Sequence, residues 1–174
     1  MIIYLIGFMG VGKSTLGKKL ASRLQLHFVD LDKEIATSEG QSIEAIFQQK
    51  GEPYFRELEI RELRKEERNN SVIAVGGGTP CFGDNLSYMK SRGTVVYLQA
   101  DAGLLCQRLL VSKSERPLIQ QFKNDPEKLR EFIDKKLEER RPFYEASDIT
   151  VSVKEMNATE IDKLIQTLKL LSKS

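Results

Sequence analysis

The chain has 174 residues, and its 27 Lys and Arg against 25 Asp and Glu give a formal net charge of +2. This length fits one domain, so we expect residues 1–174 to fold as a single unit. The near-balance of charge argues against broad nucleic-acid binding, which requires a concentrated basic face. Two cysteines without a CxxC pair and a single histidine form no cluster typical of a zinc site.

Apolar runs and helical patterns alternate along the chain. The sequence predicts, in order, a strand at Ile2–Ile6, a helix at Lys13–Leu24, a strand at His27–Asp30, helices at Lys33–Thr37, Ser42–Gln49 and Pro53–Arg68, a strand at Val72–Val75, a helix at Asp84–Arg92, a strand at Thr94–Leu98, helices at Asp101–Leu110 and from Pro126 to about Arg140, a strand at Ile149–Val153 and a helix at Ala158–Leu171. The strands lack polar alternation, which is typical of a parallel sheet covered on both faces. This order indicates a three-layer α/β/α fold.

Two further segments complete this outline. The apolar start of the chain is about half as long as a bilayer span and no basic region precedes it, so we interpret it as a buried strand of a soluble, cytoplasmic protein. The charged run that contains Arg64, Lys65 and Arg68 is interpreted as a solvated helix face.

A phosphate-binding motif follows the first strand. Residues Gly7 to Thr15 match the pattern GxxxxGK[ST] and lie between a predicted strand and a predicted helix. Glycines let backbone N–H groups converge on phosphate oxygens, Lys13 would reach the β- and γ-phosphates, and the Ser14 hydroxyl would bind Mg²⁺. The motif predicts ATP or a related nucleotide as a ligand.

Two carboxylates, Asp30 and Asp32, follow the second strand. Because ligands of parallel sheets bind beyond the carboxyl ends of the strands, one acid can act toward the metal and the other toward an acceptor hydroxyl. The alternative is that Asp32 caps the helix Lys33–Thr37, a common use of aspartate. We favour the functional interpretation because the pair would face a phosphate loop.

Three glycines and three arginines are the remaining candidates. Gly76, Gly77 and Gly78 follow the third strand, where they could let a ligand approach the backbone or only turn the chain. Arg56 lies at the start of a predicted helix, Arg116 within a connection of about thirteen residues between two helices, and Arg140 at the end of the long helix. Arginine binds a carboxylate with two parallel hydrogen bonds, which suits an anionic acceptor.

Taken together, the segments GFMGVGKST, FVDLD, GEPYFRELE, AVGGGTP, RPLI and RRPFYEASD resemble the shikimate kinase family of P-loop kinases, in the family's order and over nearly the whole chain. The resemblance implies a five-stranded parallel sheet in the order 2-3-1-4-5, a substrate-binding region at about 31–61 and a mobile lid at about 111–123. It also implies ATP-dependent phosphorylation of the 3-hydroxyl of shikimate in chorismate and aromatic amino acid biosynthesis.

The resemblance implies these roles. Lys13, Asp32 and Arg116 take part in catalysis, with Arg116 on the lid. Ser14 and Asp30 hold Mg²⁺. ATP is bound by Gly10, Val11, Gly12, Lys13, Ser14, Thr15, Arg108 and Arg116, where Arg108 lies within one residue of the family's adenine-stacking arginine and Leu109 is the other occupant of that place. Shikimate is bound by Asp32, Phe47, Phe55, Arg56, Gly77, Gly78 and Arg140; the spacing to Pro142 and Tyr144 favours Arg140 over Arg141.

Other functions fit the residues less well. A gluconate-type kinase would share the phosphate loop but not the GEPYFR and GGG segments, and a GTPase-type switch would require a guanine-binding N/T-K-x-D sequence, which the chain lacks. No basic stripe interleaved with aromatics indicates nucleic-acid binding. We therefore expect ATP and shikimate as partners, no nucleic acid or membrane, and a monomer.

Overall fold

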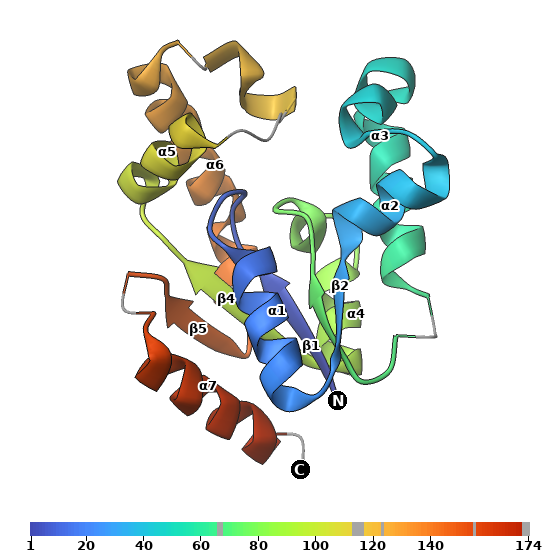
Figure 1. The fold of residues 1–174 in the computed structure, drawn as a ribbon. Coiled ribbons are helices and arrows are strands. Elements are labelled where there is room, and N and C mark those ends of the chain that lie inside the picture. Colours follow the sequence, from blue (N-terminus) through green and yellow to red (C-terminus); the bar gives the residue numbers. More distant parts are fainter. Residues whose placement is uncertain (66–67, 113–116, 123, 155, 172–174) are drawn as a thin grey trace.

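The computed structural model describes residues 1–65, 68–112, 117–122, 124–154 and 156–171. A five-stranded sheet lies at its centre (Figure 1). Its order is β2 (His27–Asp30), β3 (Ser71–Ala74), β1 (Ile2–Ile6), β4 (Thr94–Gln99) and β5 (Ile149–Ser152), and every pairing is parallel. The predicted strand order 2-3-1-4-5 is confirmed. Parallel pairing brings all the carboxyl ends to one edge, where ligands of such sheets bind.

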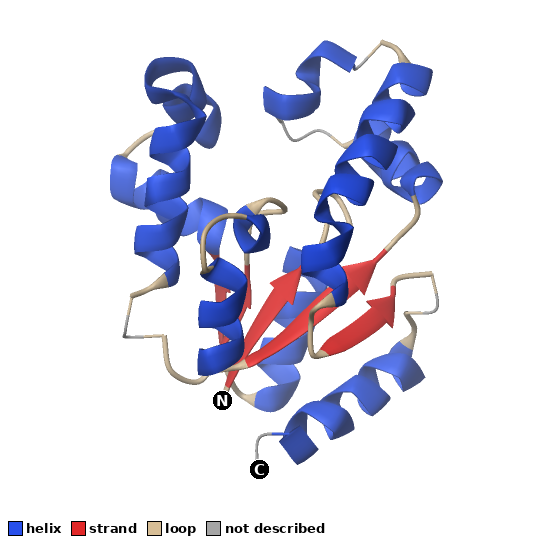
Figure 2. Ribbon diagram, turned by 180° about the vertical axis from the view of Figure 1, so that it is seen from behind, coloured by secondary structure: helices blue, strands red, loops and turns tan. Residues whose placement is uncertain are grey.

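Both faces of the sheet are buried, as the continuous apolar strands predict. In β1, Ile3 and Leu5 belong to one hydrophobic cluster, whereas Ile2, Tyr4 and Ile6 belong to the other. The first cluster takes its other side chains mainly from α1 (Lys13–Leu24), α5 (Ala102–Val111) and α7 (Ala158–Leu171), and the second from α2 (Leu31–Glu39), α3 (Ile43–Leu63) and α4 (Asn85–Arg92). The helical layers on the two sides of the sheet are visible in Figure 2. The three-layer α/β/α class is thus confirmed.

Helices α2, α3 and α6 differ most from the sequence-based bounds, whereas α4 and α5 are shifted by one residue at their ends. α2 begins directly after β2, so Asp32 is the second residue of the helix and not its cap. The two helices expected around residue 51 form one element, α3, with a kink at Gly51, whose φ of 78° a side chain would oppose. α6 (Pro126–Glu145) continues through Pro142, beyond the expected end at Arg140. Its last turn carries Tyr144, whose complete burial favours the extra helical residues despite the proline.

The prediction that Arg68 is solvated is wrong. Its side chain is only 9% exposed, and its Nη2 lies 3.4 Å from a carboxylate oxygen of the buried Glu62. A buried guanidinium requires such a partner, because an isolated charge is costly to remove from water. Lys65, in contrast, stays about half exposed, with its Nζ 2.6 Å from the same carboxylate group.

Two groups of helices stand beyond the carboxyl edge of the sheet, α2 and α3 on one side and α5 with the start of α6 on the other (Figure 1). Part of the expected lid is a short 3-10 helix, η2 (Pro117–Phe122), in which Ile119 is buried and the Phe122 ring lies 5.1 Å from that of Phe132. Residues 113–116 and 123, and with them Arg116, lie outside the described residues. None of the described helices is long and apolar enough to cross a membrane.

Candidate active site

A cavity of about 760 Å³ lies at the carboxyl edge of the sheet, between the phosphate loop and α3. Thirteen of the site residues expected from the sequence line it: Gly10, Gly12, Lys13, Ser14, Thr15, Asp30, Asp32, Phe47, Phe55, Arg56, Gly77, Gly78 and Arg140. The side chain of Val11 is instead buried in the core, and Arg108 reaches the loop from α5, its Nη1 donating a 2.7 Å hydrogen bond to the Val11 carbonyl. The structure therefore gathers most of the expected residues around one cavity.

The phosphate loop is held in shape by its glycines and its lysine. Gly7, Gly10 and Gly12 all have positive φ, and a Cβ on Gly7 would lie 2.6 Å from the Leu98 carbonyl oxygen. Lys13 Nζ donates hydrogen bonds to the carbonyls of Gly7, at 2.7 Å, and Phe8, at 3.0 Å. The loop leads into the N-terminus of α1, where backbone N–H groups and the helix dipole suit a phosphate.

Ser14 and Asp30 join the loop to β2. The Ser14 hydroxyl donates a 2.8 Å hydrogen bond to Oδ2 of Asp30. Both are oxygen ligands of the kind that Mg²⁺ prefers, and Mg²⁺ commonly keeps several waters and takes only one or two protein ligands beside substrate phosphates. The described residues include no group of three or more acidic, His or Cys side chains arranged as a metal site. The pair therefore suits a metal shared with a nucleotide better than a metal bound by protein alone.

Asp32 and Glu59 present carboxylates near the same glycine. A Cβ placed on Gly76 would lie 2.5 Å from Oε1 of Glu59 and 3.3 Å from Oδ1 of Asp32, so only glycine fits there. Asp32 is exposed as a whole residue and lines the cavity, whereas its carboxyl group is partly desolvated by its neighbours. That desolvation, together with the negative charge of Glu59, raises the pKa of Asp32 to about 6, although Lys13 and Arg56 oppose the shift. A carboxyl with this pKa can accept a proton near neutral pH.

Arg56 is fixed on the first turns after the kink of α3. Its Nη1 donates a 2.6 Å hydrogen bond to Oε2 of Glu59, while Nε and Nη2 donate to Oε1 of Glu52 at 3.1 and 2.7 Å. Glu59 is almost completely buried and also accepts a hydrogen bond from the Thr79 hydroxyl. The guanidinium borders the glycine loop, since a Cβ on Gly78 would lie 3.0 Å from both Nη atoms.

Arg140 supplies a second guanidinium from α6. The side chain is 9% exposed, its Cζ lies 5.3 Å from the centre of the Phe8 ring, and a Cβ on Gly77 would approach its Nη1 to 3.2 Å. Nη1 is buried and has no hydrogen-bond partner among the described residues. Because an unpaired buried donor is unfavourable, it marks a position where an anionic ligand would be stabilised.

Two aromatic rings from α3 complete the walls. The Phe47 and Phe55 rings, from the two halves of α3, lie 4.7 Å apart because the Gly51 kink brings them together. Sequence reasoning did not assign a role to Glu52, Thr79, Phe82 or Tyr144, which hold the arginines and the glycine loop. Glu52 and Tyr144 lie inside the recognised segments GEPYFRELE and RRPFYEASD, which was the available signal.

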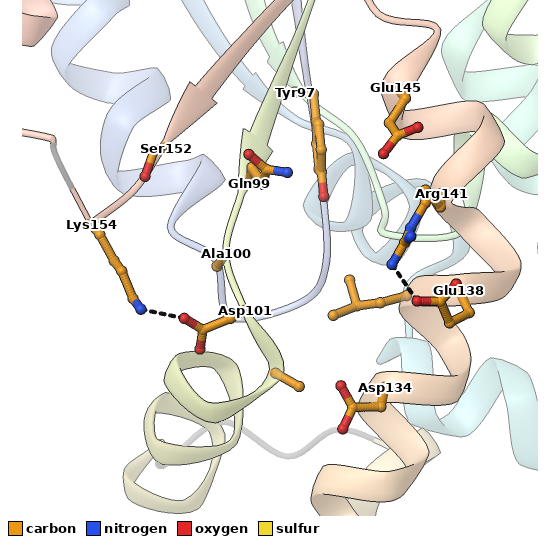
Figure 3. Close-up of a pocket in the computed structure, with 12 residues that line it drawn as sticks. Tyr97, Gln99, Ala100, Asp101, Asp134, Glu138, Arg141, Glu145, Ser152 and Lys154 are labelled. Atoms are coloured by element: carbon orange, nitrogen blue, oxygen red, sulfur yellow. Dashed lines mark hydrogen bonds and ion pairs between the residues drawn. The ribbon is translucent and has the colours of Figure 1, made fainter.

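A second cavity, of about 560 Å³, lies between the ends of β4 and β5 and the helix α6 (Figure 3). Its charged side chains are largely paired, Lys154 with Asp101 and Arg141 with Glu138. The second cavity is lined by none of the expected site residues, and it contains Arg141, whereas Arg140 lines the first cavity. We therefore place the active site in the first cavity.

The chain as a whole is similar to proteins of one family. The family model described as shikimate kinase matches residues 9–169. A shikimate kinase of Bacteroides fragilis is 42% identical over 171 residues, covering 97% of this chain and 94% of that protein. The crystal structure of shikimate kinase from Bacteroides thetaiotaomicron matches with a TM-score of 0.88 at 36% identity, covering 100% of this chain and 99% of the other. Shikimate kinase from Acinetobacter baumannii, solved in complex with shikimate, matches with a TM-score of 0.79 at 35% identity, covering 99% and 94%.

Proposed function

The chain belongs to the shikimate kinase family, and from that premise we propose which of its residues carry out the reaction. The reaction is the ATP-dependent phosphorylation of shikimate in aromatic biosynthesis. The family assignment decides against the gluconate-type kinase and the GTPase-type switch. The proposal concerns the placement of ATP and shikimate in the first cavity, the role of each side chain and the metal.

We propose that shikimate binds with its carboxylate between Arg56 and Arg140. The observation that carries this proposal is the buried, unpartnered Nη1 of Arg140, a residue that lines the same cavity as Lys13 and Asp32. Arg56 adds to it: with five N–H bonds and three hydrogen bonds to Glu52 and Glu59, two N–H bonds remain for a ligand. The backbone of Gly77 borders Arg140 and the phosphate loop, and that of Gly78 borders Arg56. Phe47 and Phe55 border the ring of the substrate.

At the other end of the cavity, Gly10 to Thr15 hold the phosphates of ATP, with Val11 contributing its backbone and Arg108 steadying that backbone through the Val11 carbonyl. When ATP binds, the Lys13 ammonium moves its hydrogen bonds from the loop carbonyls to phosphate oxygens. Ser14 and Asp30 would hold Mg²⁺, which when bound would supply charge neutralisation for the phosphates. Asp32 orients the 3-hydroxyl of shikimate and accepts its proton.

The remaining parts of the proposal concern the chain as a whole. Residues 1–174 form a single domain in which 31–61 is the substrate-binding region and 111–123 is a lid that carries Arg116 over the phosphates. Closure of such a lid excludes water, which would otherwise compete as the phosphoryl acceptor. We propose that the enzyme is a cytoplasmic monomer that interacts with neither nucleic acid nor membrane.

Titration of the two arginine variants tests the substrate assignment. Arg56→Gln and Arg140→Gln keep N–H donors for the neighbouring groups but lose the charge. We expect each to weaken shikimate binding at least about tenfold in calorimetric titration, because a charged hydrogen bond to the carboxylate is lost. ATP affinity should stay within about twofold, and Arg141→Gln, on the second cavity, is the matched control. Unchanged shikimate affinity in both variants would refute the carboxylate site.

A further inference from the structure

The aromatic ring of Phe82 lies against the guanidinium of Arg56. The Cζ atom of Arg56 is 4.1 Å from the centre of the Phe82 ring and 5.4 Å from that of Phe55. A cation within about 6 Å of a ring centre is attracted by the negative face of the ring. Phe82 is therefore the closer aromatic partner of Arg56, although it follows the glycine loop and is remote from α3 in the sequence.

This contact does not compete with the hydrogen bonds of the guanidinium. Glu52 and Glu59 accept three N–H bonds, and N–H bonds point outward in the plane of the group. The Phe82 ring instead attracts the positive charge of the guanidinium through the negative face of the ring. Its attraction therefore restrains the orientation of Arg56 while leaving the remaining N–H bonds to a substrate carboxylate.

The backbone that carries Phe82 is itself fixed to the same network. Phe82 N–H donates to the carbonyl of Thr79 at 3.5 Å, and the buried Asn85 donates from Nδ2 to that carbonyl at 3.0 Å and from its backbone to the Phe82 carbonyl at 3.2 Å. The Thr79 hydroxyl in turn donates to Glu59, the partner of Arg56. The contacts thus form a closed circuit through Thr79, Glu59, Arg56 and Phe82.

We propose that Phe82 is a positioning residue for shikimate, which sets the orientation of the Arg56 guanidinium before the substrate carboxylate arrives. The inference rests on the proposed role of Arg56 in carboxylate binding. A cation that is already oriented loses less conformational entropy on binding, so the effect falls on substrate affinity. Phe82 is 37% exposed, so replacing its ring removes little of the hydrophobic core.

The test compares Phe82→Leu with Phe82→Tyr. Leucine keeps an apolar side chain but has no aromatic face, so we expect the Kd and KM for shikimate to rise about three- to tenfold. The KM for ATP and kcat should stay within about twofold, because the contact acts only on Arg56. Tyrosine keeps the ring and should stay close to wild type. The melting temperature of each variant is measured in parallel, and Phe82→Met replaces Phe82→Leu if the latter does not fold.

Two controls separate this inference from the proposed function. Tyr88→Leu removes a ring of the same kind, 5.1 Å from Cζ of Arg64, and should leave shikimate affinity unchanged. In an Arg56→Gln background, Phe82→Leu should weaken shikimate binding no further, as in a double-mutant cycle between coupled residues. If Arg56→Gln itself binds shikimate normally, the proposed function fails. If Arg56→Gln binds weakly but Phe82→Leu binds like wild type, or weakens binding equally in both backgrounds, the positioning role is refuted.

Discussion

The hydroxyl of Tyr144 donates a 2.6 Å hydrogen bond to the carbonyl oxygen of Gly77. Tyr144 is completely buried near the end of α6, and its ring stacks on that of Tyr97 at 4.9 Å. Burial raises the pKa of Tyr144 well above its usual value, so the hydroxyl remains a neutral donor at physiological pH. The bond ties the helix that carries Arg140 to the glycine loop beside the first cavity.

Tyr144→Phe is therefore expected to weaken shikimate binding several-fold without changing ATP binding. The variant keeps the stacked ring but leaves the Gly77 carbonyl without this donor, which should lower the free energy of unfolding by about 1 kcal/mol. Calorimetric titration and urea denaturation measure the two effects. Tyr97→Phe, which removes the hydroxyl of the stacked neighbour, is the control; equal behaviour of the two variants would contradict the role of the Gly77 bond.

Lys13→Met is expected to abolish phosphoryl transfer and to leave the fold intact. The ammonium group contributes to charge stabilisation on the transferring phosphoryl group, so its loss should lower kcat by at least about two to three decades. A coupled assay of shikimate-dependent ADP release measures the rate, and circular dichroism measures folding. Lys19→Met, on the exposed side of the same helix, should behave like wild type. A folded Lys13→Met enzyme with near-normal activity would exclude the phosphate-binding role.

The lid prediction concerns residues 111–123, of which Ile119 and Phe122 are anchored against the core and α6. We expect amide hydrogen exchange across this segment to slow when a non-hydrolysable ATP analogue and shikimate are both bound, because closing loops become ordered over their ligands. Exchange in α7, which lies on the far side of the first hydrophobic cluster, serves as the internal reference. Equal protection of 111–123 with and without ligands would argue against a moving lid.

Much of the fold follows from local sequence signals. The bounds of β1, β2, α1 and α7 agree with the sequence-based prediction. At the ends of these elements the apolar pattern of the sequence stops or changes its period. The strand order came from the resemblance rather than from periodicity, since parallel pairing is decided by contacts distant in sequence. The continuation of α6 through Pro142 also escaped local rules, because the burial of Tyr144 opposes the intrinsic preference of proline.

Most of the candidate site residues could be selected from the sequence, but their supporting contacts could not. Motif spacing selects Lys13 and Asp32 as candidates, and the resemblance adds the roles of the arginines. Of the partners of Arg56, the resemblance implies only Glu59. Glu52 and Phe82 carry no local sequence signal that pairs them with this arginine, because both contacts form only when the chain folds. The prediction that Arg68 is solvated failed because the sequence does not show which partner a charged side chain will meet in the folded chain.

Asp32→Asn tests whether this carboxyl acts on the acceptor hydroxyl. The change keeps the shape of the side chain and removes its charge and its capacity to accept a proton. We expect kcat/KM for shikimate to fall by at least about two decades, a typical loss for a general base, while ATP binding is retained. Glu34→Gln is the control: this exposed residue lies two positions after Asp32 in α2, and the variant should remain fully active.

The raised pKa of Asp32 adds a pH dependence that distinguishes catalysis from a structural role. Since the pKa rises from 3.8 in an ordinary aspartate to about 6, the folded protein holds this proton more tightly than the unfolded chain. The contribution of Asp32 to stability is therefore complete below about pH 4 and is lost as the pH rises through 6, a slope that Asp32→Asn should lack in denaturation measured between these values. Activity should respond in the opposite sense, because only the ionised carboxyl accepts a proton: kcat/KM of the wild type should rise toward pH 6 and level off above it. A wild-type rate that is flat across this range, or an Asp32→Asn enzyme that keeps the same rising limb, would assign the limb to another group and remove Asp32 from the proton transfer.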